Sequence, residues 1–288
     1  MRILRFAYFA DKKNHMNDLV PSYLAELVDV LAAMPGAVAV VLGGSRALGL
    51  SDEGSDWDLG LYYRGAIDLT ALAARGGVVY PPGSWGRVMN GGAWLGWGGE
   101  RIDVLLRDLD VVEYWTGRAN KGEFEVDALL GYLAGVPTYT LSAELASCRV
   151  LRGEIPDAPF APKLVTAAPP RWRFCRSFSL DYARMHASRG NRLGTAGQAA
   201  KAALEEAHAV RCEQSQWVCN EKRLIESAGL AGVSALFGQI PIDSAALVRW
   251  VDLVADQLGV PRGATAPWRR TQTDDGGDRE PPTLDRVL

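Results

Sequence analysis

The spacing of hydrophobic residues predicts a short helix followed by a buried strand near the start of the chain. The apolar positions of the helix are Leu24, Leu27, Val28 and Leu31. They recur with the period of an amphipathic helix over residues 21–34, and Pro35 and Gly36 would stop it. The following run AVAVVLGG, residues 37–44, is rich in β-branched residues and predicts a strand that ends at two glycines.

Apolar runs further along the chain predict two more strands. They are WDLGLYY at 57–63 and RIDVLLRD at 101–108. Helical patterns are expected over residues 66–75, 110–117 and 123–134. The first half of the chain is therefore expected to combine a mixed sheet with flanking helices.

Residues 83–99 have an unusual composition, with seven glycines and three tryptophans. A glycine-rich hairpin or loop whose tryptophans pack on the sheet is the interpretation we favour. The alternative is an aromatic wall for a planar ligand.

The second half of the chain has a helical pattern. Five prolines in residues 152–172 indicate a connection between domains. Helices are expected over 196–217, with Glu205 and Glu206 on a solvated face, and over 244–258, capped by Asp243 or Ser244.

We therefore expect an α+β protein with two domains. A catalytic domain with a mixed β-sheet and flanking helices would span residues 1–155, and an all-helical substrate-binding domain would span 156–262. Residues 263–288 are polar and rich in proline and glycine, which predicts a disordered tail.

Composition excludes some classes of function. The 288 residues are 48% hydrophobic and carry a net charge of -3, so the basic surface of a nucleic-acid-binding protein is not expected. No run is long enough for a membrane span or typical of a signal peptide. The four cysteines form no CxxC pair and are interpreted as reduced, buried thiols in a cytoplasmic protein.

The segment LGGSRALGLSDEGSDWDL carries the chemistry. Side chains alternate along a strand, so Asp56 and Asp58 are expected on one face and Trp57 on the other. Asp103 also lies between two apolar residues, Ile102 and Val104, in the 101–108 strand. Its side chain is expected to join those of Asp56 and Asp58. Carboxylates this close repel each other unless a cation intervenes, and magnesium prefers carboxylate and phosphate oxygens.

The small residues before the acids complete the pattern. Glycine lets backbone N–H groups approach an anion, the hydroxyl of Ser45 adds a donor, and Arg46 adds positive charge. An isolated Asp-x-Asp is more often a solvated turn or strand edge. The combined pattern of strand, Gly-Gly-Ser, Asp-x-Asp and a later acid predicts a nucleotide-binding metal site.

This combined pattern resembles the signature of the polymerase-β-like nucleotidyltransferase superfamily, and within it the aminoglycoside and minimal nucleotidyltransferases. The resemblance covers about residues 36–108. It implies that Gly44 and Ser45 hold a triphosphate, with Arg46 assisting. It also implies that Asp56 and Asp58 bind two Mg²⁺ ions, and that Asp103 binds the second ion, accepts the proton of the acceptor hydroxyl, or both.

The helical half resembles, more weakly, the substrate-binding domain of such enzymes. In that resemblance Lys222, in QWVCNEKRLIESAGL, reaches the nucleotide phosphates. The alternative is a solvated helix lysine, and Glu221 is expected on a solvated face.

The function that this resemblance implies is metal-dependent transfer of a nucleoside monophosphate, AMP from ATP, to a hydroxyl of a small molecule, with release of pyrophosphate. Antibiotics such as aminoglycosides and lincosamides are among the acceptors considered. The alternatives are nucleotidylation of a protein or tRNA, as in minimal nucleotidyltransferase antitoxins, and a catalytically silent nucleotide-binding regulator. The acidic net charge disfavours tRNA as a partner.

Overall fold

The computed structural model describes residues 19–260 of the 288. These residues divide into two compact units, one of residues 19–173 and 203–231 and one of residues 174–202 and 232–260. The domain limits expected at 155 and 262 stay a prediction, and the tail expected at 263–288 lies outside the described residues.

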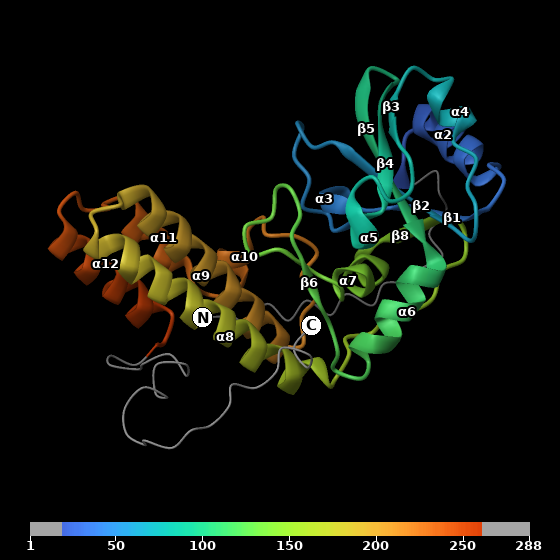
Figure 1. The fold of residues 1–288 in the computed structure, drawn as a ribbon. Coiled ribbons are helices and arrows are strands. Elements are labelled where there is room, and N and C mark those ends of the chain that lie inside the picture. Colours follow the sequence, from blue (N-terminus) through green and yellow to red (C-terminus); the bar gives the residue numbers. More distant parts are fainter. Residues whose placement is uncertain (1–18, 261–288) are drawn as a thin grey trace. The chain divides into compact units, whose positions relative to one another are not determined.

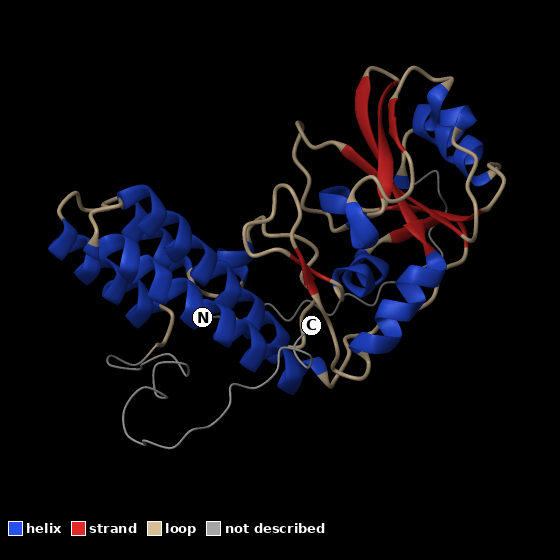
Figure 2. Cartoon of the chain, in the orientation of Figure 1, coloured by secondary structure: helices blue, strands red, loops and turns tan. Residues whose placement is uncertain are grey.

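The first unit is built on a six-stranded mixed sheet (Figures 1 and 2). Its strands, in the order β3-β4-β5-β2-β1-β8, are Val78–Tyr80, Gly91–Trp97, Glu100–Asp108, Trp57–Tyr63, Ala37–Leu42 and Arg149–Gly153. The central pair β2 and β5 is parallel, and the other neighbours in this sheet are antiparallel. The strands expected at 37–44, 57–63 and 101–108 are thus confirmed, as is the α+β class.

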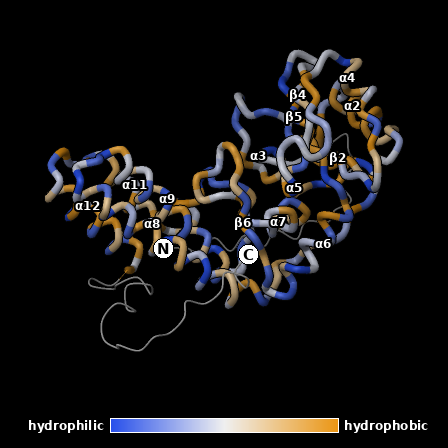
Figure 3. Tube along the Cα trace, in the orientation of Figure 1, coloured by the Kyte–Doolittle hydropathy of each residue, from blue (hydrophilic) through white to orange (hydrophobic). Residues whose placement is uncertain are grey.

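Helices cover both faces of the sheet because each strand alternates its side chains between two hydrophobic cores. Helices α2 (Ser22–Ala32) and α4 (Thr70–Ala73) pack on one face, through residues such as Leu27 and Leu72. Helices α6 (Leu109–Ala119) and α7 (Thr140–Ser147) pack on the other. Figure 3 shows α2 as largely hydrophobic, and its buried residues Leu24, Leu27, Val28 and Leu31 recur with the expected helical period.

Short elements connect the strands. Helix α3 (Gly44–Ala47) follows β1, and α5 (Gly86–Met89) precedes β4 in a hairpin with β5. The helix expected over 123–134 is wrong: that segment holds strand β6 (Val126–Asp127), which pairs with β7 (Val136–Pro137).

Helices of different lengths form the second half of the chain. They are α8 (Leu164–Ser188), α9 (Arg192–Glu213), α10 (Leu224–Ser227), α11 (Ala231–Phe237) and α12 (Ser244–Gln257). The expected cap of α12 is confirmed, because the Asp243 carboxylate accepts a hydrogen bond from Ala246 N at 2.8 Å.

The proline-rich connection expected over 152–172 is wrong in its second part, where α8 has already begun. Pro169 and Pro170 lie inside this helix and remove two of its N–H donors. Buried neighbours compensate, because Leu164, Ala168 and Trp172 are enclosed in a core cluster. Tertiary packing therefore overrides the local signal of the prolines.

Three further expectations concern the exposure of two glutamates, the state of the cysteines and membrane spans. Glu205 and Glu206 are buried rather than solvated, and Glu206 pairs with Arg173 at 3.1 Å. The four cysteines are free thiols, of which Cys148 and Cys212 are fully buried. No helix within residues 19–260 is both long enough and apolar enough to span a bilayer.

Candidate active site

The sheet register brings two of the three predicted acids together. Asp58 on β2 and Asp103 on β5 are direct partners in the parallel pair, so their side chains leave the same face of the sheet. Asp56 lies in the loop just before β2 and shares the Arg101 guanidinium with Asp103. All three acids are partly exposed. The expected joining of Asp103 to the pair is thus what the structure shows.

The glycine turn lies directly against Asp58. Gly43 N donates a hydrogen bond to the backbone oxygen of Asp58 at 2.8 Å, which joins the end of β1 to the start of β2. Gly44 has a φ of 61°, and a Cβ added there would lie 1.8 Å from Asp58 Oδ2. Only glycine meets both demands, because it has no side chain and tolerates positive φ. The backbone at Gly44 is therefore held in contact with a candidate metal-binding carboxylate.

The electrostatics of Asp58 are those of a crowded acid. Its pKa is raised from 3.8 to about 6, chiefly by burial and then by the negative charges of Asp103 and Asp56. The positive charges of Lys222 and Arg101 act in the opposite direction. A carboxyl cluster of this kind gains most from a bound cation, since the cation relieves the mutual repulsion.

Arg101 is a member of the site that sequence reasoning missed. Its Nε lies 3.3 Å from Asp103 Oδ1, and its Nη1 lies 3.7 Å from Asp56 Oδ2. Its side chain is 63% exposed, so these pairs are weak and easily displaced. Within residues 19–260, no three Asp, Glu, His or Cys side chains are arranged to hold a metal ion. The carboxylate oxygens nevertheless fit Mg²⁺, and the exposed Arg101 lies between Asp56 and Asp103.

Arg46 has a different position from the one expected. Its guanidinium donates to the backbone oxygens of Ser55 at 2.6 Å and Asp56 at 3.2 Å. It also lies over the Trp57 ring, 4.1 Å from the ring centroid. In this structure Arg46 thus holds the loop that carries Asp56, and its predicted contact with phosphate stays a prediction.

Contacts distant in sequence hold the segment that carries Lys222. Trp217 Nε1 donates to the backbone oxygen of Ala158 at 3.2 Å. The Glu221 carboxylate accepts hydrogen bonds from Leu133 N and Ala134 N, both at 2.7 Å. Glu221 therefore anchors a loop rather than lying on a solvated face. Its fixed position brings the exposed Lys222 close enough to lower the pKa of Asp58.

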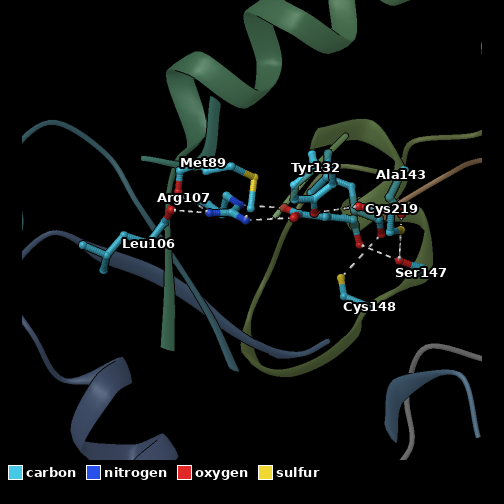
Figure 4. A network of polar contacts seen from close by, with 10 residues as sticks. Met89, Leu106, Arg107, Tyr132, Ala143, Ser147, Cys148 and Cys219 are labelled. Atoms are coloured by element: carbon cyan, nitrogen blue, oxygen red, sulfur yellow. Dashed lines mark hydrogen bonds and ion pairs between the residues drawn. The ribbon is translucent and has the colours of Figure 1, made fainter. Parts of the chain in front are cut away.

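A buried ion pair between Arg107 and Glu144 lies on the same face of the sheet as the acids, and Figure 4 shows the polar contacts of Arg107. Arg107 lies two alternations beyond Asp103 on the same face of β5 and is almost fully buried. Its guanidinium binds both carboxylate oxygens of Glu144 on α7, at 2.6 and 2.8 Å, and the backbone oxygens of Met89 and Leu106, both at 2.8 Å. This network fixes β5, which carries Asp103, against α7.

The same region connects to the Lys222 segment. Tyr132 Oη donates to the backbone oxygen of Cys219, and Ser147 Oγ lies 3.4 Å from Cys219 Sγ (Figure 4). The chain from Cys219 to Lys222 is thus tied to α7 as well as to the loop before β7.

A cavity of about 760 Å³ lies beside the acid cluster without being lined by it. It shares Ala47 and Leu48 with the end of α3, and Lys222 with the segment described above. Its charged lining side chains are Arg149, Arg211, Lys222 and Asp157. Three cations against one acid favour an anionic occupant.

No family model matches the chain, and no curated protein matches it in sequence. Among solved structures, a nucleotidyltransferase-like protein from Exiguobacterium sibiricum is similar, with 13% identity and a TM-score of 0.39 over 82% of this chain and 72% of that one. The CdnE cyclic dinucleotide synthase of Elizabethkingia meningoseptica, with GTP and Apcpp, has 11% identity and a TM-score of 0.27 over 85% of this chain and 94% of that one.

Proposed function

We propose that this protein is a metal-dependent nucleotidyltransferase that moves a nucleoside monophosphate from a nucleoside triphosphate to a hydroxyl acceptor. The observation that carries the proposal is the pairing of Asp58 with Asp103 on parallel strands, with the backbone of Gly44 held against the Asp58 carboxylate. Carboxylates for a hard cation and backbone donors for a phosphate thus meet at one point, as transfer at phosphorus requires.

The triphosphate would lie along α3. The first N–H groups of a helix have no intrahelical acceptor, and those of Gly44 and Ser45 open this one. The Ser45 hydroxyl and the Lys222 ammonium add donors nearby. The cavity at the C-terminal end of α3, which Lys222 also lines, has an excess of positive charge as well.

Asp56, Asp58 and Asp103 would hold two Mg²⁺ ions, which supply charge stabilisation for the entering and leaving oxygens. When the ions and nucleotide bind, Arg101 is free to leave the carboxylates because its ion pairs are exposed. Asp103 lies on β5, on the side of β2 away from β1, and would accept the proton of the attacking hydroxyl, bind the second ion, or both.

The reaction is a single displacement at the α-phosphorus. The acceptor oxygen forms a bond to phosphorus, the bond from that phosphorus to the β-phosphate oxygen breaks, and pyrophosphate leaves with the bonding electron pair. The hydroxyl proton passes to a carboxylate. The residues contribute position and charge, which are the main sources of rate in phosphoryl-type transfer.

ATP as the donor and a small molecule as the acceptor complete the proposal, with antibiotics as one acceptor class. Nucleotidylation of a protein or tRNA is a second acceptor class, and a silent nucleotide-binding regulator is the non-enzymatic alternative. The presence of all three acids, with Asp58 and Asp103 paired on one face, favours an active enzyme over the regulator.

The test is a pyrophosphate-release screen of the purified chain with Mg²⁺, each of the four nucleoside triphosphates, and a panel of aminoglycosides and lincosamides. Mass spectrometry identifies any nucleotidylated product. Asp58→Asn should lower the rate by about a hundredfold or more, because it removes charge at the reacting centre. Glu53→Gln is the matched control: it removes one charge from an exposed position of the same loop and should act within twofold of wild type. Survival of the Asp58→Asn rate within a few-fold contradicts the proposal.

A further inference from the structure

Three aromatic side chains lie beside the acids, on the same face of the sheet. Trp94 on β4 is the direct partner of Asp103 on β5, so the two side chains leave the same face. Tyr80 on β3 contacts Trp94 edge to face, with ring centroids 4.9 Å apart. Trp85 lies 5.2 Å from Tyr80 and 5.9 Å from Trp94. We call Tyr80, Trp85 and Trp94 the aromatic platform.

Glycine lets the platform lie close to the sheet. Gly92 is on the platform's face, and a Cβ added there would lie 2.6 Å from two ring atoms of Trp85. The Trp85 ring is thus laid on the backbone of β4. Gly96 lies four residues after Gly92 on the same face of β4 and is the strand partner of Arg101. A Cβ added at Gly96 would have no atom of the described residues within 4 Å. The Trp85 ring therefore covers Gly92, whereas no atom of the described residues covers Gly96.

The platform's Trp94 is more exposed than the neighbouring Trp97, which packs against the core. Trp97, three residues after Trp94, lies on the other face, donates to the backbone oxygen of Tyr23 at 2.7 Å, and packs against a core cluster. Trp94 is 44% exposed, and no platform member belongs to the two core clusters of the sheet. Exposed aromatic surface beside a polar site is typical of ligand recognition.

The strand order places the platform opposite the phosphate turn. Helix α3 follows β1, next to β2, whereas β4 and β3 lie on the far side of β5. The acid cluster on β2 and β5 is thus between α3 and the platform. In-line displacement requires the attacking oxygen to enter opposite the leaving pyrophosphate. With phosphates at α3, the acceptor must come from the side of Trp94.

We propose that the aromatic platform binds the acceptor, and that this acceptor is a ring compound with a flat, uncharged face and a hydroxyl at its edge. The ring lies on Trp94 and directs its hydroxyl toward Asp103. The platform residues carry no charge, so ring stacking rather than ion pairing selects the ligand. This inference rests on the proposed function and names its acceptor class.

The binding test uses the full chain labelled with ¹⁵N at tryptophan and follows the indole N–H signals, with Trp94→Phe and Trp97→Phe to assign two of them. The probes are p-nitrophenyl β-D-glucoside, methyl β-D-glucoside and sorbitol, which differ in the aryl and pyranose faces that they present. Either glucoside should shift the Trp94 signal to saturation, and sorbitol should not. The Trp97 signal, on the opposite face, should not move with any probe.

Further arms separate this inference from the proposed function. Trp94→Ala should weaken glucoside binding about tenfold, the scale of one aromatic contact, while the affinity for Mg-ATP, measured by calorimetry, stays within twofold. Asp58→Asn should keep the glucoside shift and lose Mg-ATP binding. Failure of wild type to bind Mg-ATP refutes the proposed function. Normal Mg-ATP binding with no glucoside shift at Trp94, or a Trp94 shift caused by Mg-ATP alone, overturns the platform as the acceptor site.

Discussion

Asp58→Asn should make the metal-free protein more stable while removing its activity. In the folded chain the pKa of Asp58 is raised to about 6, chiefly by burial, from a value of 3.8 in the absence of structure. A raised carboxyl pKa means that folding disfavours the ionised form. The cost is therefore absent below pH 3.8, grows as the pH rises, and is complete above about pH 6.

The magnitude follows from this difference of about two pKa units. At 1.36 kcal/mol per unit, ionised Asp58 costs the fold up to about 3 kcal/mol at neutral pH. Asparagine has nearly the same shape and no charge. We expect the variant to gain about 1–3 kcal/mol in free energy of unfolding at pH 7.5, since neighbouring side chains relax around the wild-type charge.

The assay is urea unfolding of wild type and Asp58→Asn in EDTA at pH 4.0 and pH 7.5, with Glu53→Gln as the matched control. The difference between Asp58→Asn and wild type should be small at pH 4.0 and large at pH 7.5. Added Mg²⁺ should then stabilise wild type and narrow the gap, because a ligand bound only by the folded state raises its stability. Equal or lower stability of Asp58→Asn at pH 7.5 would refute the described crowding of the acids.

Three further predictions concern the residues around the acids. Gly44→Ala should abolish Mg-ATP binding in calorimetry, because its Cβ would occupy the place of Asp58 Oδ2 at a φ that alanine resists; retained affinity contradicts the close approach. Glu144→Gln should lower the free energy of unfolding by about 3 kcal/mol, since it leaves the Arg107 charge buried without its partner; urea unfolding measures this, and a loss below 1 kcal/mol contradicts it. Glu221→Gln should raise KM for the nucleotide about tenfold by weakening two charge-assisted bonds to the loop before β7, and an unchanged KM shows that Lys222 does not depend on this anchor.

The central part of the fold was predictable because its signals are local. Strands β1, β2 and β5 are short apolar runs, and the two-residue period placed Asp58 and Asp103 on faces that the strand pairing could bring together. The spacing of Asp103 in a similar run was enough to predict an adjacent strand. The turn at Gly44 was readable as well, since glycine there has a backbone role.

The errors came from contacts between residues far apart in sequence. The segment 123–134 looks helical, but Glu221 holds its end by two backbone N–H groups from nearly ninety residues away. The prolines of α8 suggested a linker, yet burial of Trp172 keeps the helix intact. Arg101 has the sequence of an ordinary exposed strand residue, and only the register shows it between two acids. No local pattern contains such information.

The most direct test of the account is a calorimetric titration of ATP into the full chain with and without Mg²⁺. The account predicts saturable binding that requires Mg²⁺, that Asp58→Asn and Asp103→Asn abolish, and that Glu53→Gln leaves within twofold. Equal binding of ATP without a divalent ion, or unchanged Mg-ATP binding by Asp58→Asn, would contradict the claim that these paired carboxylates form a metal-nucleotide site.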